Sequence, residues 1–444
     1  MTEEVPTPQR KEVRETRIVS RRVREFPDDA YTMNRALADG AYEMWKEVLR
    51  RADKQWIHDE VKTSGLRGRG GANFPTAIKW ESLPDVYPRY LVINGDEGEP
   101  STFKDRVIVE GDPHAIIEGV CIEAYRMDCN KAFIYLRGEF ALGADRVQQA
   151  IDDAKAAGFL GTNILGSGFD LDVVLHRGAG AYICGEESAL IESLEGKRGM
   201  PRIKPPLPIH VGVYSKPTVV NNVETVSTIP HILRMGGAEY AKLGVNRSTG
   251  TRLAAISGHV EKPGVYEIEF GMTFRDIIFD LAGGVRGGKA LKFFLPGGAS
   301  FQWLTSRDEH LDQVYDIDDI SAKLGTTLGS GAIMVYDEDT DPLLVAWRLA
   351  KFYAHESCGK CTPCREGSGW VEKVLYRMSH GLGRPEDMDA LLDISAGMSP
   401  NVLGAPFSQT TICPLGPSPV SAVASLQKWF RAEVDAACNV QVSA

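Results

Sequence analysis

Hydrophobic and polar positions follow two periods in the first half of the chain. Short apolar runs between turn residues indicate buried strands, and apolar residues spaced three and four apart indicate helices. The runs at 90–94, 132–136 and 171–175 predict strands, and the stretches around 114–125 and at 141–158 predict helices between them. Strands that alternate with helices predict a largely parallel, doubly wound α/β sheet.

The chain before this sheet has a different pattern. Its first 35 residues or so are charged and show little apolar periodicity, so we expect an arm that lies over the rest of the protein. From 33 to 61, apolar residues at helical spacing predict helical structure.

The pattern changes again near residue 250 and near residue 337. Short strand candidates with one helix predict a small α+β domain, and the amphipathic helices that follow predict a bundle. The strand candidates are 252–260, 265–270, 291–295 and 332–336, with a helix at 273–282. The bundle helices are 343–355, 368–380, 386–398 and 420–436. We therefore expect three domains, at 1–249, 250–336 and 337–444, which agrees with about 150 residues per domain.

Charge and hydropathy exclude several classes of protein. The 444 residues contain 50 Lys and Arg against 60 Asp and Glu, a net charge of −10, which argues against a broad basic face for nucleic acid or anionic lipid. No apolar run approaches the roughly 18 residues of a membrane span. The N-terminal residues lack an apolar segment and carry two acids, so we expect no secretory or transit peptide and a cytoplasmic protein.

Three of the eight cysteines form a C-x2-C-x2-C motif, at Cys358, Cys361 and Cys364. This spacing lets three thiolates take three corners of a cubane, and the fourth iron needs a distant ligand. We favour Cys413, in a turn rich in Gly and Pro, over Cys438, which we expect in a frayed tail. The motif thus predicts a [4Fe-4S] cluster and one-electron transfer.

A structural zinc site is the alternative reading of these cysteines. Zinc sites usually combine two C-x2-C pairs, whereas this chain offers one triple and a single cysteine, so the iron–sulfur cluster is favoured. Lys360 and Arg365 beside the thiolates would offset the negative charge of a cluster and help set its potential.

Glycine and acidic turns follow the predicted strands. The segment GLRGRGGANFPTAIK at 65–79 could form an anion-binding concavity of backbone N–H groups, although by itself it could also be a simple turn. Asn94, Asp96, Glu97 and Glu99 follow the strand at 90–94, at the edge where open α/β sheets bind ligands, and carboxylates there suit ribose or ribityl hydroxyls.

Two later turns add polar residues that have an ordinary explanation as well. Tyr182, Glu186 and Glu187 open a helix after the strand at 171–175, and Asn221 and Asn222 follow at 218–225. Acids are common in first helical turns, and Asn commonly caps helices. Three such turns on successive strand ends nevertheless favour a ligand site.

Five segments together resemble the NADH-binding flavoprotein subunit of respiratory complex I, NADH:quinone oxidoreductase. They are GLRGRGGANFPTAIKW, NGDEGEPSTFKDR, RGAGAYICGEESALIESLEGKRGMPRIKPP, KPTVVNNVET and FYAHESCGKCTPCREG, within about 33–430. Diaphorase subunits of NAD-linked hydrogenases and formate dehydrogenases share them. The resemblance implies a Rossmann-like FMN/NADH domain, a ubiquitin-like α+β domain of the SLBB type, and a four-helix bundle with a [4Fe-4S] cluster.

The resemblance also implies roles for individual residues. The expected FMN residues are Gly68, Gly70, Lys79, Asn94, Asp96, Glu97, Tyr182, Gly185, Glu186, Val220, Asn221, Asn222 and Thr225. The expected NADH residues are Arg69, Gly71, Phe74, Glu99, Glu187 and Lys204, and the cluster ligands are Cys358, Cys361, Cys364 and Cys413. No side chain is expected to be an obligatory acid or base, and Glu97 and Tyr182 are candidates for tuning the flavin.

The chain departs from the family pattern at four places near the nucleotide. Asn73 and Ala77 stand where many members have glycine, so the loop geometry is expected to differ slightly. Ser82 and Leu207 stand where some members present Phe to the adenine, which leaves its second side open. Glu99 and Glu187 near the ribose would repel a 2′-phosphate, so we expect NADH to be preferred to NADPH.

The function expected from these observations is electron entry into complex I: hydride transfer from NADH to FMN, then single electrons to the cluster. The expected partners are a small [2Fe-2S] thioredoxin-like subunit and a large multi-cluster subunit, in a peripheral arm on the cytoplasmic face of the membrane. The chain shows no fused N-terminal thioredoxin-like domain, which favours complex I over a diaphorase. An iron–sulfur scaffold without flavin, and a zinc protein with a regulatory nucleotide, are the rivals from other classes.

Overall fold

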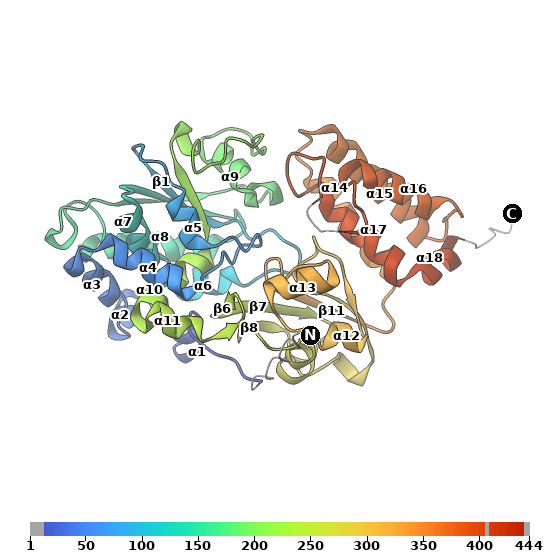
Figure 1. Ribbon diagram of the computed structural model, residues 1–444, viewed down its shortest axis with the longest axis horizontal. Coiled ribbons are helices and arrows are strands. Elements are labelled where there is room, and N and C mark those ends of the chain that lie inside the picture. The colour runs from blue at the N-terminus through green and yellow to red at the C-terminus, as the bar shows by residue number, and fades with distance from the viewer. Residues whose placement is uncertain (1–12, 405–407, 439–444) are drawn as a thin grey trace, which may run out of the picture.

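The computed structural model describes residues 13–404 and 408–438. In Figure 1 the α/β part, coloured blue to green, and the red helical bundle lie side by side, and the yellow mixed sheet lies below them. This arrangement brings three stretches of the chain together around one central region.

The α/β part is built on a four-stranded sheet in which every neighbouring pair is parallel. The strands are β1 (Tyr90–Gly95), β2 (Lys131–Leu136), β3 (Asp172–Arg177) and β4 (Thr218–Asn222), in the order β3-β2-β1-β4. The strand β4 is not among the predicted strands, because its polar end suggests a turn. It pairs with β1, with Val92 opposite Val220, so the ends of β1 and β4 lie side by side.

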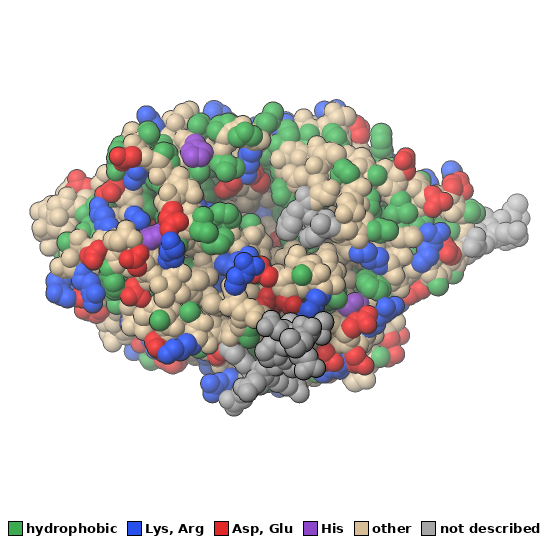
Figure 2. All heavy atoms as spheres, in the orientation of Figure 1, with side chains coloured by type: hydrophobic (Ala, Val, Ile, Leu, Met, Phe, Trp, Pro, Cys, Tyr) green, Lys and Arg blue, Asp and Glu red, His purple; other side chains and the backbone are tan. Residues whose placement is uncertain are grey.

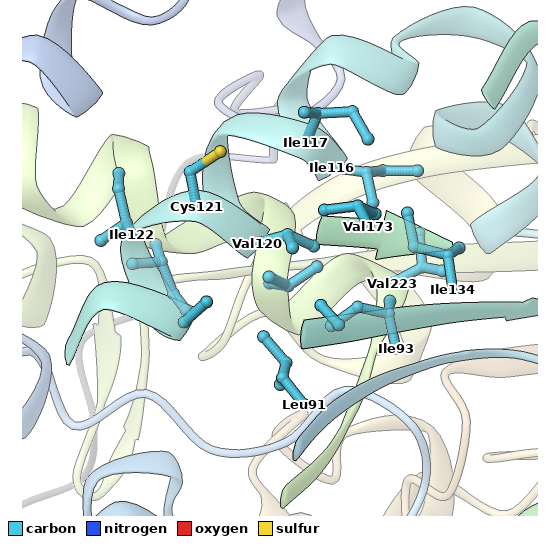
Figure 3. Close-up of a cluster of buried hydrophobic side chains, with 14 of the residues drawn as sticks. Leu91, Ile93, Ile116, Ile117, Val120, Cys121, Ile122, Ile134, Val173 and Val223 are labelled. Carbon is cyan, nitrogen blue, oxygen red and sulfur yellow. The ribbon is translucent and has the colours of Figure 1, made fainter. Parts of the chain in front are cut away.

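Apolar side chains on both sides of a helix–sheet contact hold this part together. Figure 3 shows Ile116, Ile117 and Val120 of α7 (Pro113–Met127) above Leu91 and its neighbours on the sheet. All of these side chains are buried, and α7 also packs on α8 (Ala141–Ala156) and α10 (Val223–Met235). Burying an aliphatic side chain of this size contributes about 1.5–3 kcal/mol, so the contact fixes the position of the sheet.

The helical pattern predicted over 33–61 is present and is divided into three helices. They are α2 (Met33–Ala38), α3 (Glu43–Arg51) and α4 (Lys54–Ser64). The breaks occur where Tyr42 and Ala52 adopt φ values of 64° and 52°, which end a right-handed helix. The described part of the expected arm does lie on the protein, because the amides of Ile18, Val19 and Ser20 donate to the Glu267 carboxylate.

The middle part is a five-stranded mixed sheet with its own core. Its strands, in the order β10-β9-β11-β7-β8, are β7 (Thr251–Gly258), β8 (Gly264–Glu269), β9 (Leu291–Leu295), β10 (Leu304–Thr305) and β11 (Ala332–Asp337). The predicted helix at 273–282 is present, with a π-helical stretch at Asp276–Leu281. Buried residues such as Phe270, Phe274 and Phe294 fill the space under it.

The C-terminal part is a helical bundle. It contains α14 (Pro342–Glu356), α15 (Thr362–Ser379), α16 (Asp387–Met398), α17 (Pro417–Trp429) and α18 (Arg431–Cys438). The helix predicted at 368–380 begins earlier, so Cys364 lies in its first turn, and the helix predicted at 420–436 is divided at Phe430. The expected frayed tail at Cys438 is wrong, because this residue ends α18 and is buried.

Shorter helices and a hairpin complete the described chain. They are α1 (Arg21–Glu25), α5 (Thr76–Glu81), α6 (Asp105–Gly111), α9 (Glu187–Leu194), α11 (Gly237–Ala241), α12 (Asp308–Leu311), α13 (Ile317–Leu324), β5 (Gly244–Val245) and β6 (Ser248–Thr249), with 3₁₀ turns at Ile164–Gly166, Tyr182–Gly185, Val213–Ser215 and Arg286–Gly288. Within 13–404 and 408–438, no helix combines the length and the apolar character needed to cross a membrane.

Candidate functional site

A cavity of about 650 Å³ lies at the carboxyl ends of β1 and β4 and reaches to the middle sheet and the bundle. In the space-filling view, this face of the molecule is hollowed between the α/β part and the bundle, with hydrophobic side chains beside the hollow (Figure 2). The strand β2, which follows β1 in the chain, lies on one side of β1, and β4 lies on its other side. The strand order therefore reverses at β1, and open α/β sheets bind ligands at such a switch point. Every expected FMN or NADH residue except Thr225 lines this cavity.

The glycine-rich loop forms one wall and is closed on itself. The amide of Gly68 donates to the Phe74 carbonyl at 2.8 Å. Gly71 has a φ of 130°, and a Cβ on Gly70 would lie 3.0 Å from the Asn222 Cβ, so bulkier residues would be strained or crowded. Asn73 has a φ of 53°, which Asn tolerates, and its side chain donates to the Gly71 carbonyl at 3.1 Å.

Arg69 and Thr225 face away from the cavity. The Arg69 guanidinium donates to the Thr249 carbonyl at 3.0 Å and lies 4.9 Å from the centre of the Phe270 ring, in the middle part. The Thr225 hydroxyl accepts the Arg69 amide at 2.8 Å from behind the loop. These contacts show that both side chains support the glycine loop, and that the Arg69 guanidinium is already held by protein groups.

The two asparagines at the end of β4 are already bound to protein groups. Asn222 caps α10 by accepting the Glu224 amide at 3.0 Å, and its amide group donates to Asp105 at 2.6 Å. Asn221 accepts from the Lys79 ammonium at 3.2 Å and donates to Glu123. The ordinary capping explanation therefore holds for Asn222.

Asp96 differs from its neighbours because neither carboxyl oxygen has a hydrogen-bond partner among the described residues. The side chain is 7% exposed, and burial raises its pKa to about 7. Buried polar groups in proteins are nearly always hydrogen-bonded, so an orphan carboxyl in a cavity wall matches a ligand with hydroxyl groups. The ribityl chain of FMN is such a ligand.

Glu97 is fixed by the start of α6. Its carboxylate accepts the amides of Lys104 and Asp105 at 2.9 and 2.8 Å, while burial raises its pKa to about 7. Lys104 is itself buried at the cavity wall, and its ammonium lies 2.7 Å from both Asp105 and Glu224. Lys104 and Asp105 are not among the residues expected from the sequence, because a Lys beside an Asp is typical of a solvated surface pair.

Lys204 joins the two acids at the start of α9. Its ammonium lies 2.7 Å from Glu186 and 2.8 Å from Glu187, and Glu186 also caps the helix by accepting the amides of Ser188 and Ala189. At the cavity wall nearby, Phe74 is 48% exposed and Leu207 is 46% exposed. These side chains give the cavity an apolar wall close to a charged cluster.

Four cysteines line a second, smaller pocket: Cys358, Cys361, Cys364 and Cys413. The helix α15 starts directly after Cys361, so its positive N-terminal end supports negative charge on these sulfurs. Burial raises the pKa of Cys364 to about 11 and that of Cys413 to about 12, so both need a bound cation to ionise. No three His, Cys, Asp or Glu side chains of the described chain are arranged to hold a single metal ion.

The cationic neighbours of these cysteines have partners of their own. The Lys360 ammonium donates to the Pro201 carbonyl at 2.6 Å, and Arg365 donates to Glu366 at 2.8 Å. Cys438 packs in the core of the bundle. Ile183, Cys413 and Leu415 line both the cysteine pocket and the large cavity, so a single layer of side chains separates the two.

Models of known families match all three parts of the chain. They are described as the Nuo51 FMN-binding domain at 61–231, an SLBB domain at 252–329, and the NADH-ubiquinone oxidoreductase-F iron–sulfur binding region at 344–437. The predicted fold, with its α/β domain, SLBB-type domain and iron–sulfur bundle, is confirmed by these matches.

Individual relatives match over most of the chain. The F subunit of the NADH-quinone oxidoreductase of Rickettsia bellii is 46% identical over 400 residues, which cover 89% of this chain and 93% of the relative. The corresponding F subunit of Mycobacterium tuberculosis is 49% identical over 379 residues, 84% of this chain and 82% of the relative. A solved NAD+-reducing [NiFe]-hydrogenase in the H2-reduced state matches with a TM-score of 0.80 and 33% identity over 90% of this chain and 66% of that chain. The chain belongs to the family of NADH-quinone oxidoreductase F subunits.

Proposed function

We propose that this protein is the subunit through which electrons enter an NADH:quinone oxidoreductase of the complex I type. It oxidises NADH by hydride transfer to FMN and passes electrons one at a time to a [4Fe-4S] cluster. The observation that carries this proposal is the wall of Ile183, Cys413 and Leu415 between the nucleotide cavity and the cysteine pocket. A redox cofactor in each compartment would be close enough for electron transfer without a second protein.

The cavity residues fit FMN. Bound FMN accepts a hydride and releases single electrons, which no side chain of the cavity can do. Asp96 offers two unpartnered oxygens for ribityl hydroxyls, and the glycine loop allows close approach of the backbone. Lys79 is held at the wall by the Val220 carbonyl at 2.8 Å, where its charge can offset an anionic group. The remaining proposed FMN residues are Gly68, Gly70, Asn94, Glu97, Tyr182, Gly185, Glu186, Val220, Asn221 and Asn222.

We assign NADH to the open side of the same cavity. Phe74 gives an exposed aromatic surface for the adenine, and Glu99, Glu187 and Lys204 supply charge beside it. The two acids disfavour a 2′-phosphate, which supports a preference for NADH over NADPH.

The assembly is proposed on the same basis. The expected partners are a small [2Fe-2S] thioredoxin-like subunit and a large multi-cluster iron–sulfur subunit, since the described chain offers one cysteine cluster and the electrons need an acceptor. The location is a peripheral arm on the cytoplasmic face of the membrane. The domain limits at 249/250 and 336/337 are supported by the family matches, because each limit lies in a gap between two of them, at 231–252 and at 329–344.

A diaphorase subunit of an NAD-linked hydrogenase or formate dehydrogenase is the second candidate. The likeness to an NAD+-reducing [NiFe]-hydrogenase favours it. The relatives named as F subunits of NADH-quinone oxidoreductase, which match at higher identity, favour complex I.

The proposal is tested by an anaerobic visible spectrum of the purified chain before and after NADH, with FMN and iron quantified. Bleaching of a flavin band, with one FMN and about four irons per chain, is expected. Iron without flavin would contradict it in favour of a scaffold, and zinc without iron in favour of a regulatory protein. Hydrogen-dependent NAD+ reduction by the native complex would identify the diaphorase instead.

A further inference from the structure

Ser300 occupies a point where all three parts of the chain meet. It lies between β9 and β10 in the middle part and lines the nucleotide cavity. Its amide donates to Glu99 Oε1 at 2.7 Å, and its hydroxyl donates to Glu99 Oε2 at 2.9 Å. One residue of the middle part therefore holds both oxygens of a carboxylate that belongs to the α/β part.

Ser300 is held in turn by the bundle. The Tyr353 hydroxyl, on α14, lies 3.0 Å from the Ser300 hydroxyl, and the Ser421 hydroxyl, on α17, donates to the Ser300 carbonyl at 2.8 Å. Tyr353 is fully buried. These helices flank the segments that carry the cluster cysteines, so the position of the bundle determines the position of Ser300.

The directions of these hydrogen bonds follow from the charge of Glu99. An ionised carboxylate only accepts, so Tyr182, at 2.6 Å, and Ser300 must both donate to it. Because the Ser300 hydroxyl has one hydrogen, its oxygen can only accept from Tyr353. A protonated Glu99 would have to donate to one of these oxygens, so the assignment of donors and acceptors among these residues would change.

We propose that Ser300 is a positioning residue for NADH: it holds Glu99 ionised and oriented in the cavity, and it transmits the position of the cluster-bearing bundle to that carboxylate. This inference rests on the proposed function, in which Glu99 faces NADH. Ser300 acts through Glu99.

The surroundings of Glu99 make its ionisation depend on these donors. Burial raises the Glu99 pKa, while Tyr182, Ser300 and Tyr353 favour the charged form and lower it. Tyr182 and Tyr353 are the titratable groups that act on Glu99 from the neighbouring elements, and neither carries a positive charge. Loss of one donor is therefore expected to shift the Glu99 titration upward.

The test measures the Kd of NAD+ by calorimetry and the KM for NADH across about pH 5 to 9, with the full chain loaded with FMN. In Ser300→Ala, the fall in affinity for the nucleotide at acidic pH should begin about one to two pH units higher in both profiles, because a hydrogen bond to the charged carboxylate is lost. Tyr353→Phe removes the hydrogen bond to Ser300 and one group that favours the charged form of Glu99, so its shift should be in the same direction. Glu99→Gln should abolish the dependence of Kd and KM on pH in the acidic range.

Ser425→Ala is the matched control. The Ser425 hydroxyl accepts the Trp303 amide at 2.9 Å across the same boundary between the middle part and α17, and it donates to the Ser421 carbonyl at 2.7 Å rather than to Glu99. Its loss should lower stability without moving the pH profile of Kd and KM. The proposal would be overturned if the pH profile of Kd and KM did not move in Ser300→Ala, or if it moved equally in Ser425→Ala. It would also be overturned if the wild-type Kd and KM did not depend on pH in the acidic range. Failure of the proposed function is distinct, because NADH would then not bleach the wild-type chain.

Discussion

Replacing Asp96 by Asn should change how the stability of the FMN-free chain depends on pH. The Asp96 carboxyl is buried without a partner among the described residues, and its pKa is raised from 3.8 to about 7. Below about pH 4 it is protonated in the folded and the unfolded chain and contributes nothing. Between about pH 4 and pH 7 only the folded chain keeps the proton, so the free energy of unfolding falls as the pH rises.

The size of this effect follows from the two pKa values. A tenfold change in an ionisation constant corresponds to about 1.36 kcal/mol, so the full cost above pH 7 is about 4 kcal/mol, and about 3 kcal/mol of it develops between pH 5 and pH 8. The amide that replaces the carboxyl does not ionise, so this loss should be absent in Asp96→Asn. Glu97 and Glu123 also have a pKa of about 7, but they remain in both proteins and cancel in the comparison.

The assay is urea unfolding of the FMN-free wild type and variant, followed by circular dichroism near pH 5 and near pH 8. Asp85→Asn is the control for the same Asp-to-Asn change, because the Asp85 side chain lies at the surface and is 87% exposed. An Asp96→Asn variant that loses as much stability as the wild type over this range would refute the reasoning. The same variant should bind FMN about tenfold more weakly, since a hydrogen bond to a charged group is lost.

Three further predictions follow from the site. Cys413→Ser should lose most of its iron and the electron paramagnetic resonance signal of a reduced cluster, whereas Cys438→Ser should keep both; equal losses would contradict the choice of the fourth ligand. Glu187→Gln should narrow the ratio of kcat/KM for NADH over NADPH by about tenfold, because it removes one charge near the 2′ position, and an unchanged ratio would remove Glu187 from the ribose site. Lys104→Met should lower the free energy of unfolding by about 3–5 kcal/mol in urea, because it leaves the buried carboxylates of Asp105 and Glu224 without their cation. A loss below about 1 kcal/mol would show that these ion pairs contribute no more than exposed ones.

Local patterns in the sequence are enough to predict the main elements and most of the cavity wall. The strands β1, β2 and β3 each contain a short apolar run, and the C-x2-C-x2-C motif brings its cysteines together by spacing alone. The strand β4 escapes prediction because its last two residues are asparagines. The helical pattern at 33–61 does not show where the three helices end, because Tyr42 and Ala52, which have positive φ values at the breaks, are not residues that signal a left-handed backbone.

Side-chain direction is the part that sequence cannot supply. The charge of Arg69 suits a phosphate, but its guanidinium is bound to the Thr249 carbonyl in the β5–β6 hairpin. Lys104 has the local sequence of a surface residue, but Glu224, far away in sequence, meets it because α6 and α10 pack together. The roles of individual residues toward FMN and NADH stay predictions, since they depend on such tertiary contacts.

The cysteine pocket is walled by segments from distant regions of the chain. Cys358, Cys361 and Cys364 come from the start of the bundle, but Ile183 and Pro201 come from the α/β part. A bundle that has folded before it docks therefore offers thiols with one side of their pocket still open to solvent. Docking of the α/β part closes that side, so the wall of the cysteine pocket is complete only when both parts are in contact.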